Sequence, residues 1–219
     1  MKSNLRNRLL NVAVAVLAVA AIAMVAYRTK QWFFSDSASS VSTPIHVEHW
    51  QHIADNGQRI GPTNARVTVV MFGDFECPFC RSAATDLNRL MTEHPATIAV
   101  VFRHYPLSFH PYAMDAARSA VCGGRQGVFQ PMYKLLFDKQ DSLGKKSWLQ
   151  FANDAGARDS IAFSTCMTDP SVDSVIRQDS IAGDALHIRG TPGLLVNDEL
   201  FLGWPGYETL KRYVIKAGA

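Results

Sequence analysis

The sequence lacks the short motifs by which several large enzyme classes are recognised. It contains no Gly-x-Ser-x-Gly turn, no phosphate-binding glycine loop and no dinucleotide fingerprint. It also has no internal repeat and only one Cys-x-x-Cys pair. Serine hydrolases, phosphate-loop nucleotidases and dinucleotide-dependent dehydrogenases are therefore without support.

Basic residues are scarce outside the N-terminus. The formal net charge is +3, yet residues 1–30 hold five lysines and arginines and no acidic residue. This leaves fewer basic than acidic residues in the rest of the chain, and they form no basic stripe. We therefore expect no nucleic-acid partner.

Cysteine is also scarce, with four residues in the whole chain. Zinc would need a second pair of ligands at suitable spacing, but Cys122 and Cys166 stand alone in the sequence. Three histidines recur at every third position ahead of the core domain, where we expect a solvated lead-in. They are His46, His49 and His52. We expect no metal and no cofactor.

One long apolar run is present, from Leu9 to Tyr27, and it contains no charged residue. As a helix it covers about 28 Å, close to the ~30 Å core of a bilayer. We expect residues 1–30 to be an uncleaved membrane anchor, with a signal peptide cleaved near Ala23 as the alternative. Both interpretations export the rest of the chain. The Ser-rich residues 31–44 then form a linker, and residues 45–219 form the folded domain.

The segment Cys77-Pro78-Phe79-Cys80 lies where a predicted strand gives way to a predicted helix. Residues 67–72 are apolar and β-prone, whereas apolar residues recur at helical spacing after Cys77. Pro78 suits the first helical position. Cys77 is therefore expected at the exposed N-terminus of a helix, where the helix dipole alone brings its pKa towards about 7–8.

The two cysteines are expected to differ in role. Cys77 would be the attacking thiolate, and Cys80 a buried resolving thiol with a higher pKa. Phe79 adds no charge that would lower the pKa of Cys77 further. Asp74 and Glu76 are candidates for proton handling at Cys80, although simple loop carboxylates need no role.

The remaining patterns predict a mixed sheet with helices on its faces. Residues 97–102 read as a second strand, residues from about 110 to 186 as helices, and residues 194–202 as a β-hairpin before a closing helix. Cys122 and Cys166 fall in helical segments. A bridge between them in an oxidising compartment closes a loop of about 45 residues, worth about 4 kcal/mol. Two buried free thiols, or a second redox pair near Cys77, are the alternatives.

The segment Phe72–Cys80 resembles the active-site signature of DsbA-like thioredoxin-fold proteins. The sequence Gly190-Thr191-Pro192 is similar to the cis-proline loop of that family, and residues 120–129 and 163–166 are similar to its helical insert. The resemblance covers about residues 60–217. It implies an α/β thioredoxin fold, βαβ then ββα, with a helical insertion at about 106–187.

The same resemblance implies an extracytoplasmic thiol–disulfide oxidoreductase with Thr191 and cis-Pro192 beside the dithiol. Phe79 and Thr191 replace the histidine and valine of the strongly oxidising members, which argues against the strongest oxidising power. We expect Cys77 and Cys80 to oxidise cysteine pairs in reduced or misoxidised exported proteins, with an integral membrane protein as redox partner. A reductase or isomerase using the same dithiol is the alternative. A non-catalytic binding module with a structural Cys77–Cys80 bridge is the alternative of a different class.

Overall fold

The computed structural model describes residues 17–25 and 43–218, which fall in two separate units, residues 1–41 and 42–219. In the first unit, residues 17–25 form a helix with exposed side chains. The predicted span from Leu9 to Tyr27 lies partly outside the described residues, as does most of the predicted 31–44 linker. Within the residues described, none of the helices has the length and apolar character needed to cross a membrane.

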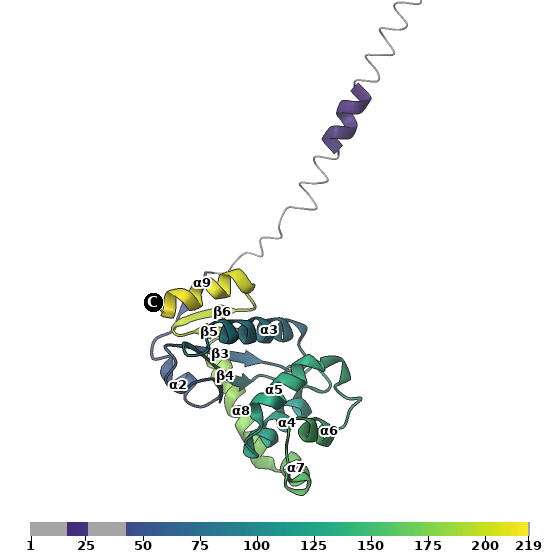
Figure 1. Cartoon of the computed structure of the whole chain (residues 1–219), viewed down its shortest axis with the longest axis vertical. Helices are drawn as coiled ribbons and strands as arrows, with labels where there is room; N and C mark the ends of the chain where they lie inside the picture. Colours follow the sequence, from purple (N-terminus) through teal and green to yellow (C-terminus); the bar gives the residue numbers. More distant parts are fainter. Residues whose placement is uncertain (1–16, 26–42, 219) are drawn as a thin grey trace, which may run out of the picture. The chain divides into compact units, whose positions relative to one another are not determined.

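The second unit is built on a mixed six-stranded sheet with the order β1-β6-β5-β3-β4-β2 (Figure 1). The strands are β1 Ile45–His46, β2 Gln58–Ile60, β3 Val67–Gly73, β4 Ile98–His104, β5 Gly193–Val196 and β6 Glu199–Leu202. Only β3 and β4 run parallel, joined through helix α3 (Pro78–Glu93), as the βαβ pattern predicts. All residues of both strands are buried, which explains why their sequences are mostly apolar.

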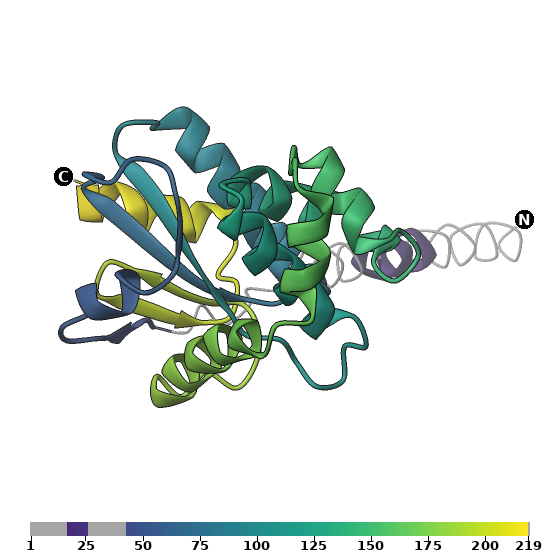
Figure 2. The ribbon, with the colours of Figure 1, turned by 90° about the horizontal axis from the view of Figure 1, so that it is seen from below.

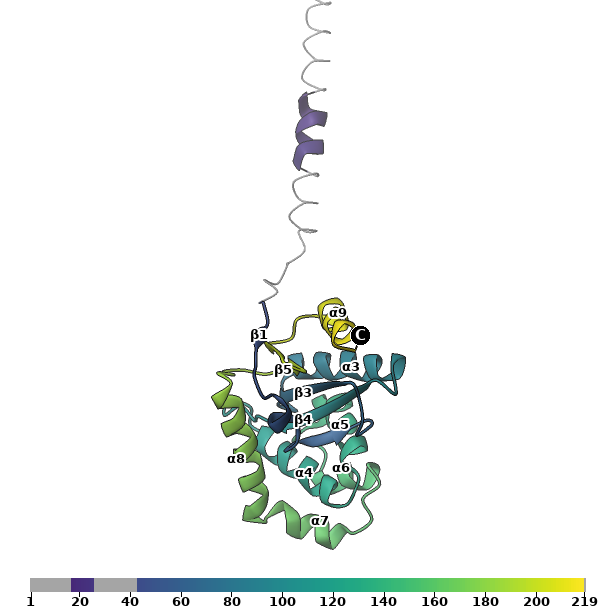
Figure 3. The same cartoon turned by 90° about the vertical axis from the view of Figure 1, so that its left-hand side faces the viewer.

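Helices cover both faces of this sheet. Alternate residues of β3 point to opposite faces, so Val69 and Met71 join one core cluster and Val70 and Phe72 the other. Helices α3 and α9 (Tyr207–Gly218) pack on the first face, and α2 (Gln51–Ala54) and α8 (Pro170–Ala185) on the second. Figures 2 and 3 show α3 and α9 on the opposite side of the sheet from α8.

A helical insertion separates β4 from β5. It comprises α4 Ala113–Arg125, α5 Phe129–Asp138, the short helix η1 Gln140–Ser142, α6 Trp148–Asp154, α7 Ser160–Met167 and α8. Aromatic rings join it to the sheet domain: the ring of Phe75 lies 4.8 Å from that of Phe137, and the ring of Phe102 lies 5.3 Å from that of Tyr133. The insertion therefore shares one core with the segment that carries the cysteines.

The lead-in at residues 45–60 differs from the expectation. It contributes β1 to one edge of the sheet and β2 to the other, and α2 buries Ile53 beneath the sheet. These elements span two to four residues, too short for a periodic pattern to reveal them. His46, His49 and His52 are nevertheless exposed. Among the described residues there is no group of three or more metal-ligating side chains.

Candidate active site

The two cysteines of the Cys-x-x-Cys segment lie at the start of α3, immediately beyond the carboxyl end of β3. Cys77 is the N-cap residue, in extended conformation, and Pro78 opens the helix. Both thiols are free. Cys80 is fully buried and Cys77 is only 4% exposed, so the expected exposed position of Cys77 is wrong. The sequence places Cys77 at a helix terminus but does not show that a distant loop covers it.

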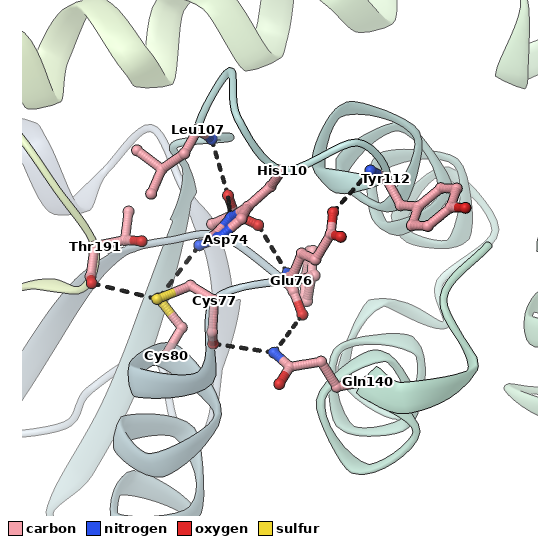
Figure 4. Close-up of polar contacts among 10 residues, drawn as sticks. Asp74, Glu76, Cys77, Cys80, Leu107, His110, Tyr112, Gln140 and Thr191 are labelled. Carbon is pink, nitrogen blue, oxygen red and sulfur yellow. Dashed lines mark hydrogen bonds and ion pairs between the residues drawn. The ribbon is translucent and has the colours of Figure 1, made fainter.

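That loop precedes β5 and contains a cis peptide bond between Thr191 and Pro192. The Cys77 thiol donates a hydrogen bond to the carbonyl oxygen of Thr191 at 3.4 Å (Figure 4). The Tyr105 hydroxyl in turn donates to the carbonyl of Ile188 at 2.9 Å and holds the start of the loop. Two segments 114 residues apart therefore meet at the sulfur.

The two thiols are tuned in opposite directions. A hydrogen bond from the Cys80 thiol, together with the side chain of Thr191 and the backbone N–H groups of Cys80 and Phe79, lowers the pKa of Cys77 to about 6 against the effect of burial. This is lower than the helix dipole alone predicts, because the hydrogen bonds add to it. Burial raises the pKa of Cys80 well above its usual value. At pH 7 Cys77 is therefore about nine-tenths thiolate, and Cys80 stays protonated.

The carboxylate of Asp74 is buried and occupied by three partners. It accepts hydrogen bonds from the backbone N–H groups of Glu76 (2.7 Å) and Leu107 (2.8 Å), and it lies 2.8 Å from Nδ1 of His110. Its own backbone N–H points at the sulfur of Cys80 at 3.4 Å. Asp74 thus contacts Cys80 through its backbone, and its side chain fastens the cysteine loop to the segment before α4.

Glu76 fastens the same segment a second time, by accepting a hydrogen bond from the N–H of Tyr112 at 2.7 Å. The two carboxylates predicted as proton handlers therefore both hold the loop between β4 and α4. That loop carries Phe109, which is 73% exposed, and the start of α3 carries Phe79, which is 61% exposed. Each of the two segments that these contacts join thus carries an exposed aromatic side chain.

Gln140 is a site residue that the sequence did not reveal. It belongs to η1 in the insertion, is buried, and donates from Nε2 to the carbonyl oxygens of Phe75 (2.7 Å) and Cys77 (3.0 Å). A single glutamine in a short turn carries no sequence pattern, so only the folded chain brings it to the cysteines.

A hollow of about 360 Å³ lies beside the cis-proline loop. Its lining residues are His187, Arg189, Gly190, Thr191, Leu202 and Gly203. Together with the nearby thiolate, it offers room for a peptide segment next to the backbone of Thr191. The arrangement suits thiol–disulfide exchange and needs no cofactor.

A protein-family model described as thioredoxin matches residues 54–216 of the chain. The match includes the cysteine loop, the insertion and the cis-proline loop.

The chain is also similar to curated proteins named Na⁺/H⁺ antiporter. It is 36% identical over 160 residues to NhaA 3 of Salinispora tropica, covering 73% of this chain and 24% of that protein. It is 32% identical over 139 residues to NhaA 1 of Mycolicibacterium vanbaalenii, covering 63% and 22%. The chain thus spans about a quarter of the length of these relatives.

Three solved structures illustrate the similarity of fold. A thioredoxin-like oxidoreductase from Silicibacter pomeroyi is 26% identical, with a TM-score of 0.66 over 78% of this chain and 98% of that one. DsbA2 of Pseudomonas aeruginosa is 27% identical, with a TM-score of 0.55 over 71% and 91%. BdbD of Bacillus subtilis, 20% identical with a TM-score of 0.66 over 80% and 95%, shares the fold.

Proposed function

The chain belongs to the DsbA-like thioredoxin family of thiol–disulfide oxidoreductases, and we propose that its Cys77–Cys80 pair oxidises cysteine pairs in exported proteins. The observation that carries this direction is the Cys77 thiol, whose pKa is lowered to about 6 beside a Cys80 that stays protonated. A stabilised thiolate favours the reduced form of the enzyme, and an oxidant must favour its own reduced form.

The reaction begins with the Cys77–Cys80 disulfide. A substrate thiolate attacks the sulfur of Cys77, the sulfur–sulfur bond breaks, and Cys80 leaves with the electron pair and takes up a proton. A second substrate thiolate then attacks the substrate sulfur of the mixed disulfide and releases Cys77 as a thiolate. The substrate loses two electrons as its disulfide forms, and the enzyme gains them as a dithiol.

The lowered pKa of Cys77 makes a moderate contribution to the reduction potential. Lowering the pKa of Cys77 from its ordinary range to about 6 stabilises the reduced form about tenfold at pH 7. For a two-electron couple, tenfold corresponds to about 30 mV towards a more oxidising potential. The contribution has the sign required of an oxidase. It is moderate, in keeping with Phe79 and Thr191 in place of the histidine and valine of the strongest oxidants.

The substrate side of the site is the cis-proline loop. An extended peptide can pair with the backbone at Thr191 in the manner of an added strand, placing its cysteine at Cys77. The hollow lined by Leu202, His187 and Arg189 then receives a neighbouring side chain. Such backbone pairing tolerates many sequences, as an oxidant of varied clients requires.

We further propose that the protein works outside the cytoplasmic membrane, held by residues 1–30 and re-oxidised by an integral membrane protein. The disulfide between Cys122 and Cys166 supports an oxidising compartment. The curated relatives support work at a membrane, because their matching segment is part of a much longer chain named as an ion antiporter. Release as a soluble periplasmic protein after cleavage is the alternative.

Other functions of the same site would differ from oxidation in measurable ways. A reductase would run the same dithiol in the opposite direction. An isomerase of the kind that carries a dimerisation domain is less favoured, because residues 45–60 are too few for such a domain. They form strands β1 and β2 of the sheet and the short helix α2. A binding module would keep a Cys77–Cys80 bridge that resists mild reductant.

The experiment is the reduction potential of the full-length chain in detergent, measured against glutathione buffers. A value at or above about −180 mV supports the oxidase. A value near −270 mV assigns the reductase, and a bridge that does not equilibrate with glutathione assigns the binding module. The Cys77→Ser chain is the control, because it cannot form the pair.

A further inference from the structure

Gln140 is the residue of the insertion that bonds directly to the backbone around Cys77. Its Nε2 group donates to the carbonyls of Phe75 and Cys77 at 2.7 and 3.0 Å. In Figure 4, Gln140 and Thr191 lie on opposite sides of the cysteines. The carbonyl of Cys77 is thus held towards Gln140, whereas its sulfur bonds to Thr191.

This orientation matters because the charge of a thiolate is sensitive to nearby dipoles. The carbonyl of Cys77 also accepts the N–H of Arg81 at 3.2 Å, which closes the first turn of α3. With that turn formed, the N–H groups of Phe79 and Cys80 lie in the first turn of α3, next to the residue that caps it, and they help to lower the pKa of Cys77. A second carbonyl turned towards the sulfur, in addition to that of Thr191, would repel the negative charge.

Without the Gln140 amide, the buried loop loses a donor that serves two acceptors. The carbonyl of Cys77 keeps the N–H of Arg81, but the buried carbonyl of Phe75 loses its donor. A buried carbonyl without a partner costs about 1–3 kcal/mol, so the loop will turn to find another donor. The other loop contacts, from Asp74 and Glu76, bind the segment before α4 and leave these two carbonyls untouched. Gln140 therefore fixes a part of the loop that the carboxylates do not.

We propose that Gln140 is a positioning residue of the dithiol: it holds the carbonyls of Phe75 and Cys77 towards the insertion and so keeps Cys77 in the conformation that stabilises its thiolate. The proposal rests on the dithiol function above and deepens it. It makes the helical insertion part of the redox centre as well as a cover over it.

The test compares two substitutions of Gln140 in the full-length chain. Gln140→Met keeps the length of the side chain and removes the donor. Gln140→Glu keeps the shape and puts an acceptor against the two carbonyls. Gln126→Met is the matched control, because Gln126 also bridges backbone groups within the insertion, donating to the carbonyl of Asp159 and accepting from the N–H of Arg158.

Two readouts are used: the pH titration of thiolate absorbance and the equilibrium with glutathione. We expect the pKa of Cys77 to rise in both Gln140 variants, more in Gln140→Glu. In Gln140→Met we expect the equilibrium to move about threefold towards the oxidised enzyme, equal to about 14 mV, because the other contacts of the Cys77 sulfur remain. Gln126→Met should stay within twofold of wild type.

Gln140 variants that fold and stay within twofold of wild type in both readouts would overturn the proposal. Failure of both variants to fold would also overturn it, because Gln140 would then serve the fold and not the dithiol. The wild-type potential alone tests the proposed function, whereas differences between variants test Gln140. Each can therefore fail without the other.

Discussion

The chain carries two pairs of cysteines that are similarly buried and chemically opposite. Cys77 and Cys80 are free thiols, whereas Cys122 and Cys166 form a disulfide. No cysteine of either pair is more than 9% exposed, so burial does not separate the pairs. The two pairs differ in their positions on the helices. Cys77 caps the N-terminus of α3, whereas the bridged cysteines lie near the C-terminal ends of α4 and α7.

A helix N-terminus favours an anion and a C-terminus disfavours one. A thiolate formed on reduction of the Cys122–Cys166 bridge is therefore not stabilised by its helix. The nearby cation, Arg125, is already paired with other groups. Arg125 lies 3.7 Å from the sulfur of Cys166, but it bonds to Asp169 and Ser171 at 2.7 Å each. Helix polarity and hydrogen bonds, and not burial, therefore distinguish the pair suited to disulfide exchange from the structural pair.

The loops that the two bridges close also differ. Cys122 and Cys166 are 44 residues apart, and a bridge over that loop constrains the unfolded chain by about 4 kcal/mol. The four-residue loop of Cys77 and Cys80 gives only about 2 kcal/mol by the same relation. One pair thus stabilises the fold, and the other remains easy to open.

The largest effect is expected from removing the attacking sulfur. Cys77→Ser should reduce oxidation of a two-cysteine peptide to the uncatalysed rate, because no mixed disulfide can form. The chain in which Cys122 and Cys166 are both serine should keep most of the wild-type rate. Comparable loss of rate in both chains, measured by peptide oxidation at equal protein concentration, would contradict the division of roles.

The second effect is on stability. Replacing both Cys122 and Cys166 by serine should lower the free energy of unfolding by about 4 kcal/mol, since the unfolded chain is released from the bridge. Urea unfolding measures the loss. The reduction potential of the Cys77–Cys80 pair in the same chain should stay within about 10 mV of wild type. A larger change would show that the two cysteine pairs are coupled.

The third effect appears as a dependence on pH. The pKa of Cys77 is lowered in the folded reduced protein, so its contribution to stability grows as pH rises above about 6 and is lost as pH falls through that value. The reduced protein should therefore gain up to about 1.4 kcal/mol per pH unit relative to the oxidised protein between about pH 6 and pH 8. Above that range the raised pKa of Cys80 opposes the gain.

Urea unfolding of both redox forms at several pH values measures this difference. Groups shared by the two forms cancel in the comparison. Reduced Cys77→Ser is the control and should show no such slope. If the free energy of unfolding depended on pH in the same way for the oxidised and the reduced wild-type protein, the pKa of Cys77 would not be lowered in the folded state.

The smallest effect is expected at Phe79. Phe79→His adds a cation between the cysteines below about pH 6.5 and should make the pair more oxidising by up to about 30 mV at pH 6. Solvent screening limits the gain, because position 79 is 61% exposed. Phe79→Gln is the neutral control. An equal shift at pH 6 and pH 8 would assign the effect to loop conformation and not to charge.

The sequence predicts those parts of the molecule that depend on local pattern. The buried strand before Cys77, the helix after it and the hairpin at residues 194–202 follow from periodicity and turn residues. Pro78 at the start of α3 marks the helix terminus that tunes Cys77. These features need no knowledge of distant segments.

The remaining features depend on contacts between distant segments. Cys77 is covered by a loop 114 residues away, and Gln140 approaches the cysteine loop from 63 residues away. The carboxylate of Asp74 binds a segment 33 residues on, a choice that composition does not indicate. The strands β1 and β2 are too short to show a pattern and form only because the sheet offers them edges.

The order of the strands also has a consequence for the newly made chain. The strand β3, which positions the dithiol, pairs with β5, and Val69 lies opposite Val196. During synthesis from the N-terminus, Cys77 and Cys80 emerge long before this neighbour and before Cys166. For that interval three cysteines are available and the partner of Cys122 is absent, so the wrong bridge can form. Under the proposed function, a new copy whose Cys122 and Cys166 are still reduced is itself a substrate for a mature one. The supply of correctly bridged enzyme would then depend on enzyme already present.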